Sequence, residues 1–389
     1  MALISVIMPV YNVEKYLENS LNSVLTQSFT DIEVICVNDE STDGSLEILK
    51  EFEQKDRRVK VINQKNRGNG GARNTGLKHA KGEYIYFFDS DDALFPEALE
   101  KMYENITSNE SDLVLFKVAR YVEGEPLNYN RPIFPLDKKF KGKDFDDFTF
   151  TYKDIKYYIM DSGYFAVWAK FYKKEFLDEH GDILVFPENT AFGDVRFHIA
   201  SMILASRISF VNDFLYRYTL SNKNSITQNK SNRMDIFGVV DSVEEFFMKT
   251  GYFEEFKDDF IKFKIHQLLF YMFSANSDEY FNRVYEEFSK IKIEDYNVPT
   301  VYKGKYELVL DSKNYKNFLR IITSFDNKKN EKYNIITKTK ETEKLKKENK
   351  KLKNQIKEYK FRKIVRLIDK IKHCTCAKCP KSYILKKIF

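Results

Sequence analysis

The feature that most constrains the fold is a repeat of short apolar runs, each ending in polar residues. A helical pattern, or a stretch long enough to cross back over a sheet, separates the runs LISVIMPV, IEVICVN, VKVI and EYIYFF. This alternation is typical of β-α-β units with parallel strands. Because the ligand crevice of such a sheet lies outside the carboxyl ends of its strands, distant residues converge there. The chain therefore predicts a doubly wound α/β domain with one site at that edge.

The polar clusters that follow the runs are the candidate site. They begin at Asn12, Asp39, Asn66 and Asp89. Asn12 also stands where it would cap a helix, since apolar residues follow it at the helical period. Two common phosphate binders are excluded, because the first run is not followed by G-x-G-x-x-G and the chain contains no G-x-x-x-x-G-K-[ST].

The third cluster, NRGNGGARNTG, combines glycines with an arginine. Gly68, Gly70 and Gly71 would let the backbone approach a ligand closely, and Arg73 offers a planar fork of donors suited to phosphate oxygens. An ordinary glycine-rich loop is the alternative explanation, and these residues alone do not exclude it.

The fourth cluster is Asp89-Ser90-Asp91-Asp92. Asp89 and Asp91 point to one side of the chain, so both would face a diphosphate only with a divalent cation between the like charges. Hard oxygen ligands select Mg²⁺ or Mn²⁺ over zinc. The alternative is that Asp92 caps a helix beginning near Pro96 and the other aspartates are solvated. The position at the end of a predicted strand favours the cation site.

Over roughly residues 3–120 the chain resembles family 2 glycosyltransferases of the GT-A fold. The resemblance lies in ISVIMPVYN, VNDESTDGS, NRGNGGARNTGL and GEYIYFFDSDD, in order and with similar spacing. It implies a nucleotide-sugar donor with UDP as its nucleotide, and Mn²⁺ or Mg²⁺ on the diphosphate. The implied roles are base and ribose contacts for Pro9, Tyr11, Asn12 and Asp39, nucleotide contacts for Asn66, Arg73, Asp89 and Ser90, and the metal for Asp91. Asn38 departs from the family, many of whose members carry a second aspartate there.

A later segment, FPENTAFGDVRFHI, is similar to the part of the family that supplies the catalytic carboxylate. Gly193 stands in place of the first of two acids, which leaves Asp194 as the predicted base. One carboxylate suffices to take the acceptor hydroxyl proton as the oxygen attacks the anomeric carbon opposite the diphosphate, which inverts that centre. Asp194 would also serve as a helix N-cap. Glu188 is the next candidate base.

Two further segments resemble the family less closely. WAKFYKKEFL would place Trp168 near the sugar, where the indole would stack on a pyranose ring, with Lys170 as a further acceptor or sugar contact. Burial of Trp168 as a core anchor is an equal alternative. YRYTLSNKNSIT resembles a loop that closes over the diphosphate, but Asn222 replaces the usual arginine. Lys223 or Arg217 would have to substitute.

The predicted domain organisation follows from changes in pattern and charge. A GT-A domain over 1–228 precedes a helical appendage over 229–330, a short coiled coil over 331–360 and a basic amphipathic tail over 361–389. Residues 331–389 hold 20 lysines and arginines against 6 acids, net +14, so residues 1–330 carry −8 of the total of +6.

The sequence patterns of the two C-terminal segments, 331–360 and 361–389, predict what each of them binds. The coiled-coil spacing, with Asn349 as a register-setting polar residue, favours a parallel homodimer, and a single charged helix is the alternative. The amphipathic tail is typical of binding to an anionic membrane surface, and docking on its own domain is the alternative. Cys374, Cys376 and Cys379 are crowded within six residues, so free thiols are favoured over a zinc site.

The compartment is predicted from what the sequence does not contain. The chain has no run of 18 apolar residues and no secretory leader, so we expect a cytoplasmic protein held peripherally at the inner face of the cell membrane. The aromatic content of 15% is better explained by a core than by nucleic-acid binding.

Taken with the resemblance, these patterns favour an inverting, metal-dependent glycosyltransferase. It would extend a glycan or lipid-linked acceptor in cell-surface polysaccharide synthesis. One alternative is a transferase of the same fold that acts on a polyol-phosphate acceptor. The other is a catalytically silent nucleotide-sugar-binding scaffold that dimerises through its tail, an option that Gly193 and Asn222 favour.

Overall fold

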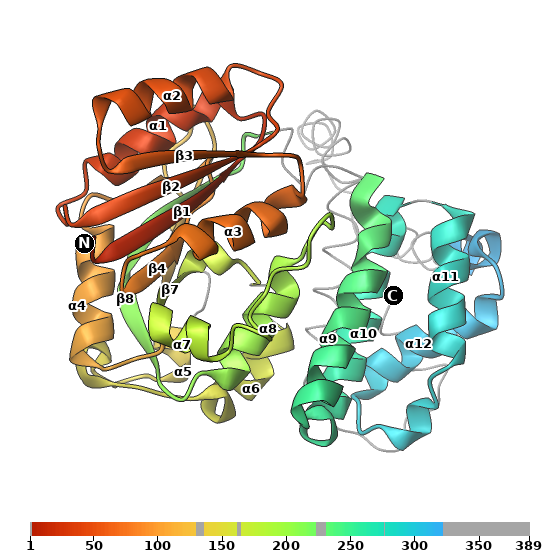
Figure 1. Ribbon diagram of the computed structural model, residues 1–389. Helices are drawn as coiled ribbons and strands as arrows, with labels where there is room; N and C mark the ends of the chain where they lie inside the picture. Colours follow the sequence, from red (N-terminus) through yellow and green to blue (C-terminus); the bar gives the residue numbers. More distant parts are fainter. Residues whose placement is uncertain (1, 130–135, 162–164, 223–230, 276, 322–389) are drawn as a thin grey trace, which may run out of the picture. The chain divides into compact units, whose positions relative to one another are not determined.

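The computed structural model describes residues 2–129, 136–161, 165–222, 231–275 and 277–321 (Figure 1). Contacts divide the chain into unit 1, Met1–Gly251, and unit 2, Tyr252–Phe389. Unit 1 thus extends past the domain end expected at residue 228 and includes one more helix. The predicted coiled coil and basic tail lie outside the described residues.

Unit 1 is built on an eight-stranded sheet with the order β3-β2-β1-β4-β7-β6-β8-β5. Its strands are β1 (Ile4–Val10), β2 (Ile32–Asp39), β3 (Val59–Gln64), β4 (Tyr84–Phe87), β5 (Ala93–Leu94), β6 (Leu113–Tyr121), β7 (Lys170–Lys173) and β8 (Ile208–Thr219). The pairs among β1, β2, β3 and β4 are parallel, as is β6 with β8. β7 runs antiparallel to β4 and β6, and β5 runs antiparallel to β8. The predicted parallel-dominated α/β fold is confirmed.

Helices cover both faces of the parallel half of the sheet (Figure 1). The helices of unit 1 are α1 (Glu14–Leu25), α2 (Ser45–Lys55), α3 (Gly68–His79), α4 (Ala98–Ser108), α5 (Leu136–Lys139), α6 (Tyr152–Asp161), α7 (Lys174–Glu179), α8 (Asp194–Leu204) and α9 (Asp235–Thr250). α1 and α2 lie on one face and α3 on the other. Every residue of β1 and β2 is buried, which explains why these central strands are continuous apolar runs.

Asn12 does not cap α1, so that expectation is wrong. The N-cap position is Val13, which makes no side-chain capping bond. Asn12 has a φ of 51°, in the left-handed region that asparagine tolerates. Its Oδ1 accepts the N–H of Thr42 at 2.7 Å, while Ser45 Oγ accepts the N–H of Val13 at 3.0 Å. The loop after β2 therefore satisfies the start of α1, and Asn12 joins the two strand ends.

The glycine-rich segment begins a helix rather than a loop. Gly68, with a φ of 71°, is the first residue of α3. A Cβ on Gly70 would lie 2.1 Å from the Pro187 carbonyl oxygen, and one on Gly76 would lie 2.3 Å from Ile7 Cγ2. The close approach that these two glycines permit is therefore to the protein itself.

The regular elements in the described residues of unit 2 are helices, and no strand follows β8 in any described part of the chain. Its helices are α10 (Phe253–Ala275), α11 (Asp278–Ser289) and α12 (Thr300–Ser312). Ser277 caps α11 by accepting the Tyr280 N–H at 3.1 Å. Lys264 and Glu287 form a buried ion pair at 2.9 Å between α10 and α11. The predicted change to helix alone beyond residue 228 is confirmed for these ranges.

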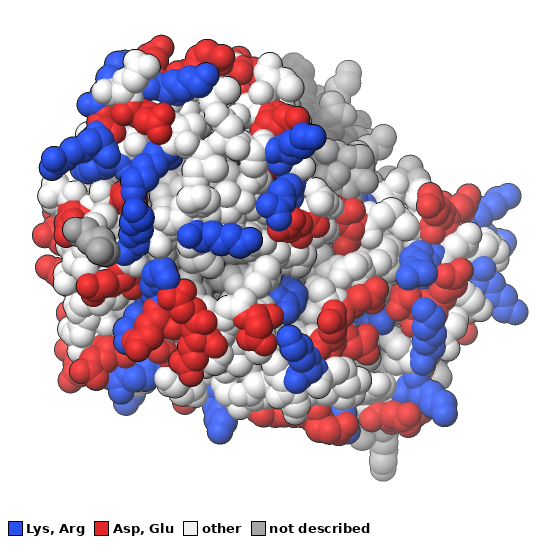
Figure 2. All heavy atoms as spheres, in the orientation of Figure 1, with Lys and Arg blue, Asp and Glu red and all other residues white. Residues whose placement is uncertain are grey.

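Two surface properties complete the description. No helix in the described ranges is both long and apolar enough to cross a membrane. On the face shown in Figure 2, basic and acidic side chains are interspersed rather than gathered into a basic stripe.

Candidate active site

The polar clusters at the ends of β1 to β4 are joined by hydrogen bonds. Asn12 and Thr42 connect the first to the second. Asp39 Oδ1 accepts from Gln64 Nε2 at 2.7 Å and from the Arg67 N–H at 2.9 Å, which connects the second to the third. Arg73 connects the third to the fourth through Asp89. The convergence that the β-α-β pattern predicted is present.

The link between Arg73 and Asp89 is a partly buried ion pair. Arg73 Nη2 lies 2.7 Å from Asp89 Oδ1, and the arginine side chain is 6% exposed. The guanidinium lies 5.4 Å from the centre of the Phe186 ring. Arg73 Nε is buried with no hydrogen-bond partner among the described residues. An unused donor beside an engaged one is suited to a phosphate oxygen.

The acidic turn lies between β4 and β5. Burial, and then the negative charge of Asp89, raise the pKa of Asp91 to about 6. Asn222 Nδ2 donates to Asp91 Oδ2 at 2.8 Å. Ser90 is buried within the turn. A divalent cation would relieve the repulsion between Asp89 and Asp91, so these carboxylates fit the predicted ion.

The ion would need further ligands. Within the described ranges, no three His, Cys, Asp or Glu residues are grouped so as to hold a metal. Mg²⁺ and Mn²⁺ are usually bound by one or two carboxylates together with substrate phosphates and water. The turn is therefore suited to a cation that arrives with a diphosphate.

Asp92 does not cap α4, whose N-cap is Glu97, so that alternative is wrong. Its Oδ2 accepts the Tyr216 hydroxyl at 2.5 Å, and its Oδ1 accepts the Thr219 N–H at 2.6 Å. Burial, followed by the charge of Asp91, raises the pKa of Asp92 well above its usual range. Asp92 thus ties the acidic turn to β8, which brings Asn222 to Asp91.

Asp194 is the first residue of α8, and Gly193 occupies the N-cap position, so Asp194 is not the cap. Burial raises the pKa of Asp194, and Asp89 acts in the same direction, whereas Arg73 and Lys170 lower it. The helix N-terminus also favours a negative charge there. A carboxylate with a raised pKa is a better proton acceptor, as a general base requires.

Lys170 begins β7, and Trp168 lies two residues before it. Lys170 is fully buried, and its Nζ donates to the Ala166 carbonyl at 2.6 Å. Burial lowers the pKa of Lys170 to about 7, although Asp194 acts in the opposite direction. Trp168 is 7% exposed and stacks on Tyr216 and Tyr218 with centroids 4.5 and 5.0 Å away. These contacts are those of a buried core residue, which was the alternative to sugar stacking for Trp168.

The remaining predicted nucleotide contacts differ in exposure. Pro9 is buried in β1, Tyr11 is 45% exposed, and Asn66 is exposed. Asn66 Oδ1 accepts the Gly68 N–H at 3.1 Å and so shapes the start of α3. Tyr11 is an exposed aromatic residue directly after β1, and an exposed ring beside the strand ends is suited to contact a base.

The sequence also offered Glu188 as an alternative base, and Arg217 or Lys223 as substitutes for the missing arginine. Glu188 forms an ion pair with Arg67, and this contact holds the pKa of Glu188 below its usual range, which disfavours it as a base. Arg217 lies over the Tyr121 ring at 4.8 Å, within β8. Lys223 lies outside the described residues.

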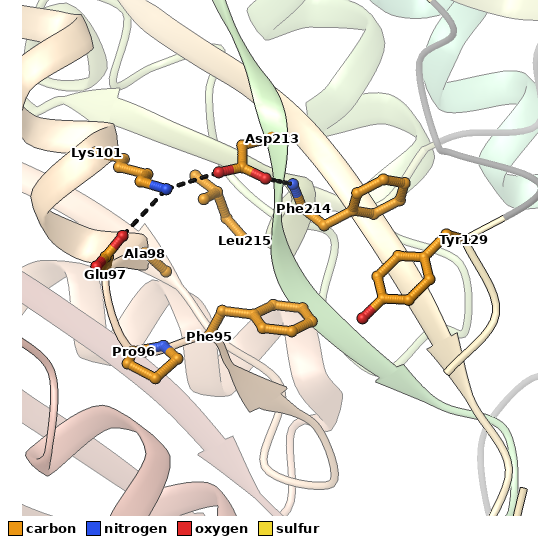
Figure 3. Close-up of a pocket in the computed structure, with 9 residues that line it drawn as sticks. All are labelled: Phe95, Pro96, Glu97, Ala98, Lys101, Tyr129, Asp213, Phe214 and Leu215. Atoms are coloured by element: carbon orange, nitrogen blue, oxygen red, sulfur yellow. Dashed lines mark hydrogen bonds and ion pairs between the residues drawn. The ribbon is translucent and has the colours of Figure 1, made fainter. Parts of the chain in front are cut away.

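A separate hollow of about 310 Å³ lies between α4 and β8 (Figure 3). Phe214 and Tyr129 stack edge to face at its wall, with ring centroids 4.8 Å apart. Lys101 Nζ donates to Asp213 at 2.6 Å across its rim. None of the predicted site residues lines this hollow, so it is distinct from the joined clusters.

The solved structures define the class of fold. S. aureus TarS residues 1–349, in complex with UDP-GlcNAc, matches with a TM-score of 0.52. The match covers 80% of this chain and 91% of that chain at 23% identity. At this identity the likeness concerns the fold alone, which is that of a GT-A transferase.

Sequence comparisons then identify the family. The model for glycosyl transferase family 2 matches residues 5–180. Glycosyltransferase GlyG of Streptococcus pneumoniae serotype 4 is 34% identical over 223 residues, which are 56% of this chain and 70% of the relative. Glycosyltransferase GlyA of the same organism is 32% identical over 222 residues, and the match spans 30% of its length. The chain belongs to glycosyltransferase family 2.

Two contributions to the site had no signal in the sequence. The sequence suggested a helix cap for Asp92, and at Asn222 it showed only that the usual arginine is replaced. Their actual partners, Thr219 and Asp91, are more than 120 residues away. A pairing of this kind leaves no local pattern, and only covariation among relatives would have indicated it.

Proposed function

We propose that the chain is an inverting, metal-dependent hexosyl- or N-acetylhexosaminyltransferase that uses a UDP-sugar. The acceptor is a glycan or lipid-linked glycan in cell-surface polysaccharide synthesis. The observation that carries the proposal is the buried Arg73–Asp89 pair beside Asp91, at the edge where Asp39 also lies. The UDP-GlcNAc in the TarS complex supports the choice of UDP.

Different strand-end residues contact different parts of the donor. Tyr11, with Pro9 and Asn12 behind it, contacts the base, and Asp39 contacts the uracil or ribose. Asn66 and Arg73 contact the nucleotide from α3, and Asp89 with Ser90 borders the ribose. Asp91 holds the cation, and Lys170 supports the sugar and acceptor region.

The cation, when bound, supplies positive charge that neutralises the diphosphate as it leaves. Asp194 takes the proton from the acceptor hydroxyl while that oxygen attacks the anomeric carbon. The bond from the anomeric carbon to the diphosphate oxygen breaks on the opposite face, and the nucleotide diphosphate departs with the electron pair. One displacement of this kind inverts the anomeric centre.

The test is a screen of nucleotide sugars scored by release of nucleotide diphosphate, with Mn²⁺, Mg²⁺ or chelator. We expect release from a UDP-sugar that stops with chelator and with Asp91→Asn. Donor binding without turnover under every condition would favour the silent scaffold, to which the substitution at Gly193 points. Turnover that survives both chelator and Asp91→Asn would overturn the metal assignment.

A further inference from the structure

Asn222 is placed against the acidic turn by the fold. Its Nδ2 lies 2.8 Å from Asp91 Oδ2, and the residue is 7% exposed. The two bonds from Asp92 to Tyr216 and Thr219 fix the end of β8 beside the same turn. A buried amide held by this framework is a built part of the site rather than a surface contact.

Beyond the acidic turn, the described residues offer the proposed cation few protein ligands. Asp89 already accepts from Arg73 at 2.7 Å, and no cluster of three acids, histidines or cysteines occurs in the described parts of the chain. Mg²⁺ and Mn²⁺ favour octahedral sites with six oxygen ligands, and carbonyl oxygens suit them as carboxylates and water do. A neutral oxygen close to Asp91 would therefore complete the site without adding charge.

The amide of Asn222 has one donor end and one acceptor end. While Asp91 is free, the N–H group faces its carboxylate. A cation on Asp91 Oδ2 would repel that N–H group, and rotation of the amide by about 180° would present the carbonyl oxygen instead.

We propose that Asn222 is the second protein ligand of the cation, to which it turns its carbonyl oxygen when the ion binds. This inference rests on the proposed function, in which Asp91 holds the ion on the donor diphosphate. The residue that replaces the expected arginine would then be a gain for metal binding, and it would no longer favour a silent scaffold.

The experiment measures Mn²⁺ affinity by electron paramagnetic resonance of the full chain with saturating UDP. We expect Asn222→Ala to weaken Mn²⁺ binding by roughly tenfold or more, and Asn222→Asp to retain or strengthen it, since a carboxylate also supplies oxygen. Leu220→Ala, at a 42% exposed position two residues away, is the matched control and should bind Mn²⁺ normally. UDP binding in chelator, measured by calorimetry, should be equal in all variants if they fold.

The outcomes separate this inference from the proposed function. Equal Mn²⁺ affinity in wild type and Asn222→Ala would overturn it, and tighter binding by Asn222→Ala would show that the amide only competes with the ion. If Asp91→Asn loses Mn²⁺ in those cases, the proposed function stands. If wild type binds no Mn²⁺, or Asp91→Asn binds it normally, the metal assignment fails and this inference fails with it.

Discussion

At the scale of single residues, the site is made of ionisable groups in surroundings that disfavour their charged forms. Burial raises the pKa of Asp91 and Asp194 and lowers that of Lys170. Such shifts cost stability in the free protein and are typical of functional sites. Each shift can be tested at its own residue.

Asp194→Asn should bind the UDP-sugar as wild type does but transfer the sugar more slowly by about 10²- to 10⁴-fold, because an amide cannot accept the hydroxyl proton. The comparison is single-turnover transfer at saturating donor. Glu188→Gln is the matched control, since Glu188 is engaged by Arg67. Normal transfer by Asp194→Asn together with loss in Glu188→Gln would move the base to Glu188.

Lys170 should make the protein more stable as the pH rises above 7. Its folded pKa of about 7 is below the unfolded value of 10.5, so between these values the unfolded chain binds more protons. The free energy of unfolding of wild type should therefore increase by up to about 1.4 kcal/mol per pH unit relative to that of Lys170→Met. Urea denaturation at pH 7.5 and 9 measures the difference.

Lys101 provides the control for this pH dependence. Asp213 raises the pKa of Lys101, so Lys101 is protonated in both states over this range. The difference in unfolding free energy between Lys101→Met and wild type should therefore be the same at pH 7.5 and at pH 9. A Lys170→Met difference that is the same at both pH values would contradict the assignment of a depressed pKa.

At the scale of elements, α3 shows how packing overrides helix propensity. Glycine is unfavourable inside a helix by up to about 1 kcal/mol relative to alanine. α3 nevertheless carries Gly70 and Gly76, because Pro187 and Ile7 lie where their Cβ atoms would be. The helix therefore gives up local stability for contact with β1 and with the segment before α8.

Gly70→Ala should destabilise unit 1 by about 1–3 kcal/mol, because the Pro187 backbone must move away from the new methyl group. Gly238→Ala in α9 is the matched control, since nothing lies within 4 Å of its Cβ position. That variant should be more stable by about 0.5–1 kcal/mol. Chemical denaturation measures both, and equal stabilisation by the two substitutions would contradict the packing.

At the scale of the whole molecule, the net negative charge of residues 1–330 and the net positive charge of residues 331–389 suggest that the two segments have different tasks. The former contain the family motifs and the joined strand-end clusters. The latter carry net +14 and lie outside the described residues. Membrane binding and dimerisation by this tail stay predictions from the sequence.

The full chain should sediment with anionic liposomes and be released by high salt, since each basic residue near an anionic surface contributes roughly 1 kcal/mol and is screened by ions. A chain truncated after residue 330 should lose this binding and keep UDP-sugar hydrolysis. Neutral liposomes are the control. Equal sedimentation of both forms would leave the tail without a membrane role.

The class of fold, the first four strands, and the edge of the sheet at which Asp39, Arg73 and Asp89 meet could all be predicted from the sequence. These features follow from hydrophobic periodicity and from residues at strand ends, both of which are local. Three features became visible only in the folded chain: Asn12 joins two loops, Gly70 packs on Pro187, and the acidic turn is bonded to the end of β8 through Asp92 and Asn222. Those contacts join residues about 30 to more than 120 positions apart, and chemistry at such separation depends on the folded geometry rather than on any local pattern.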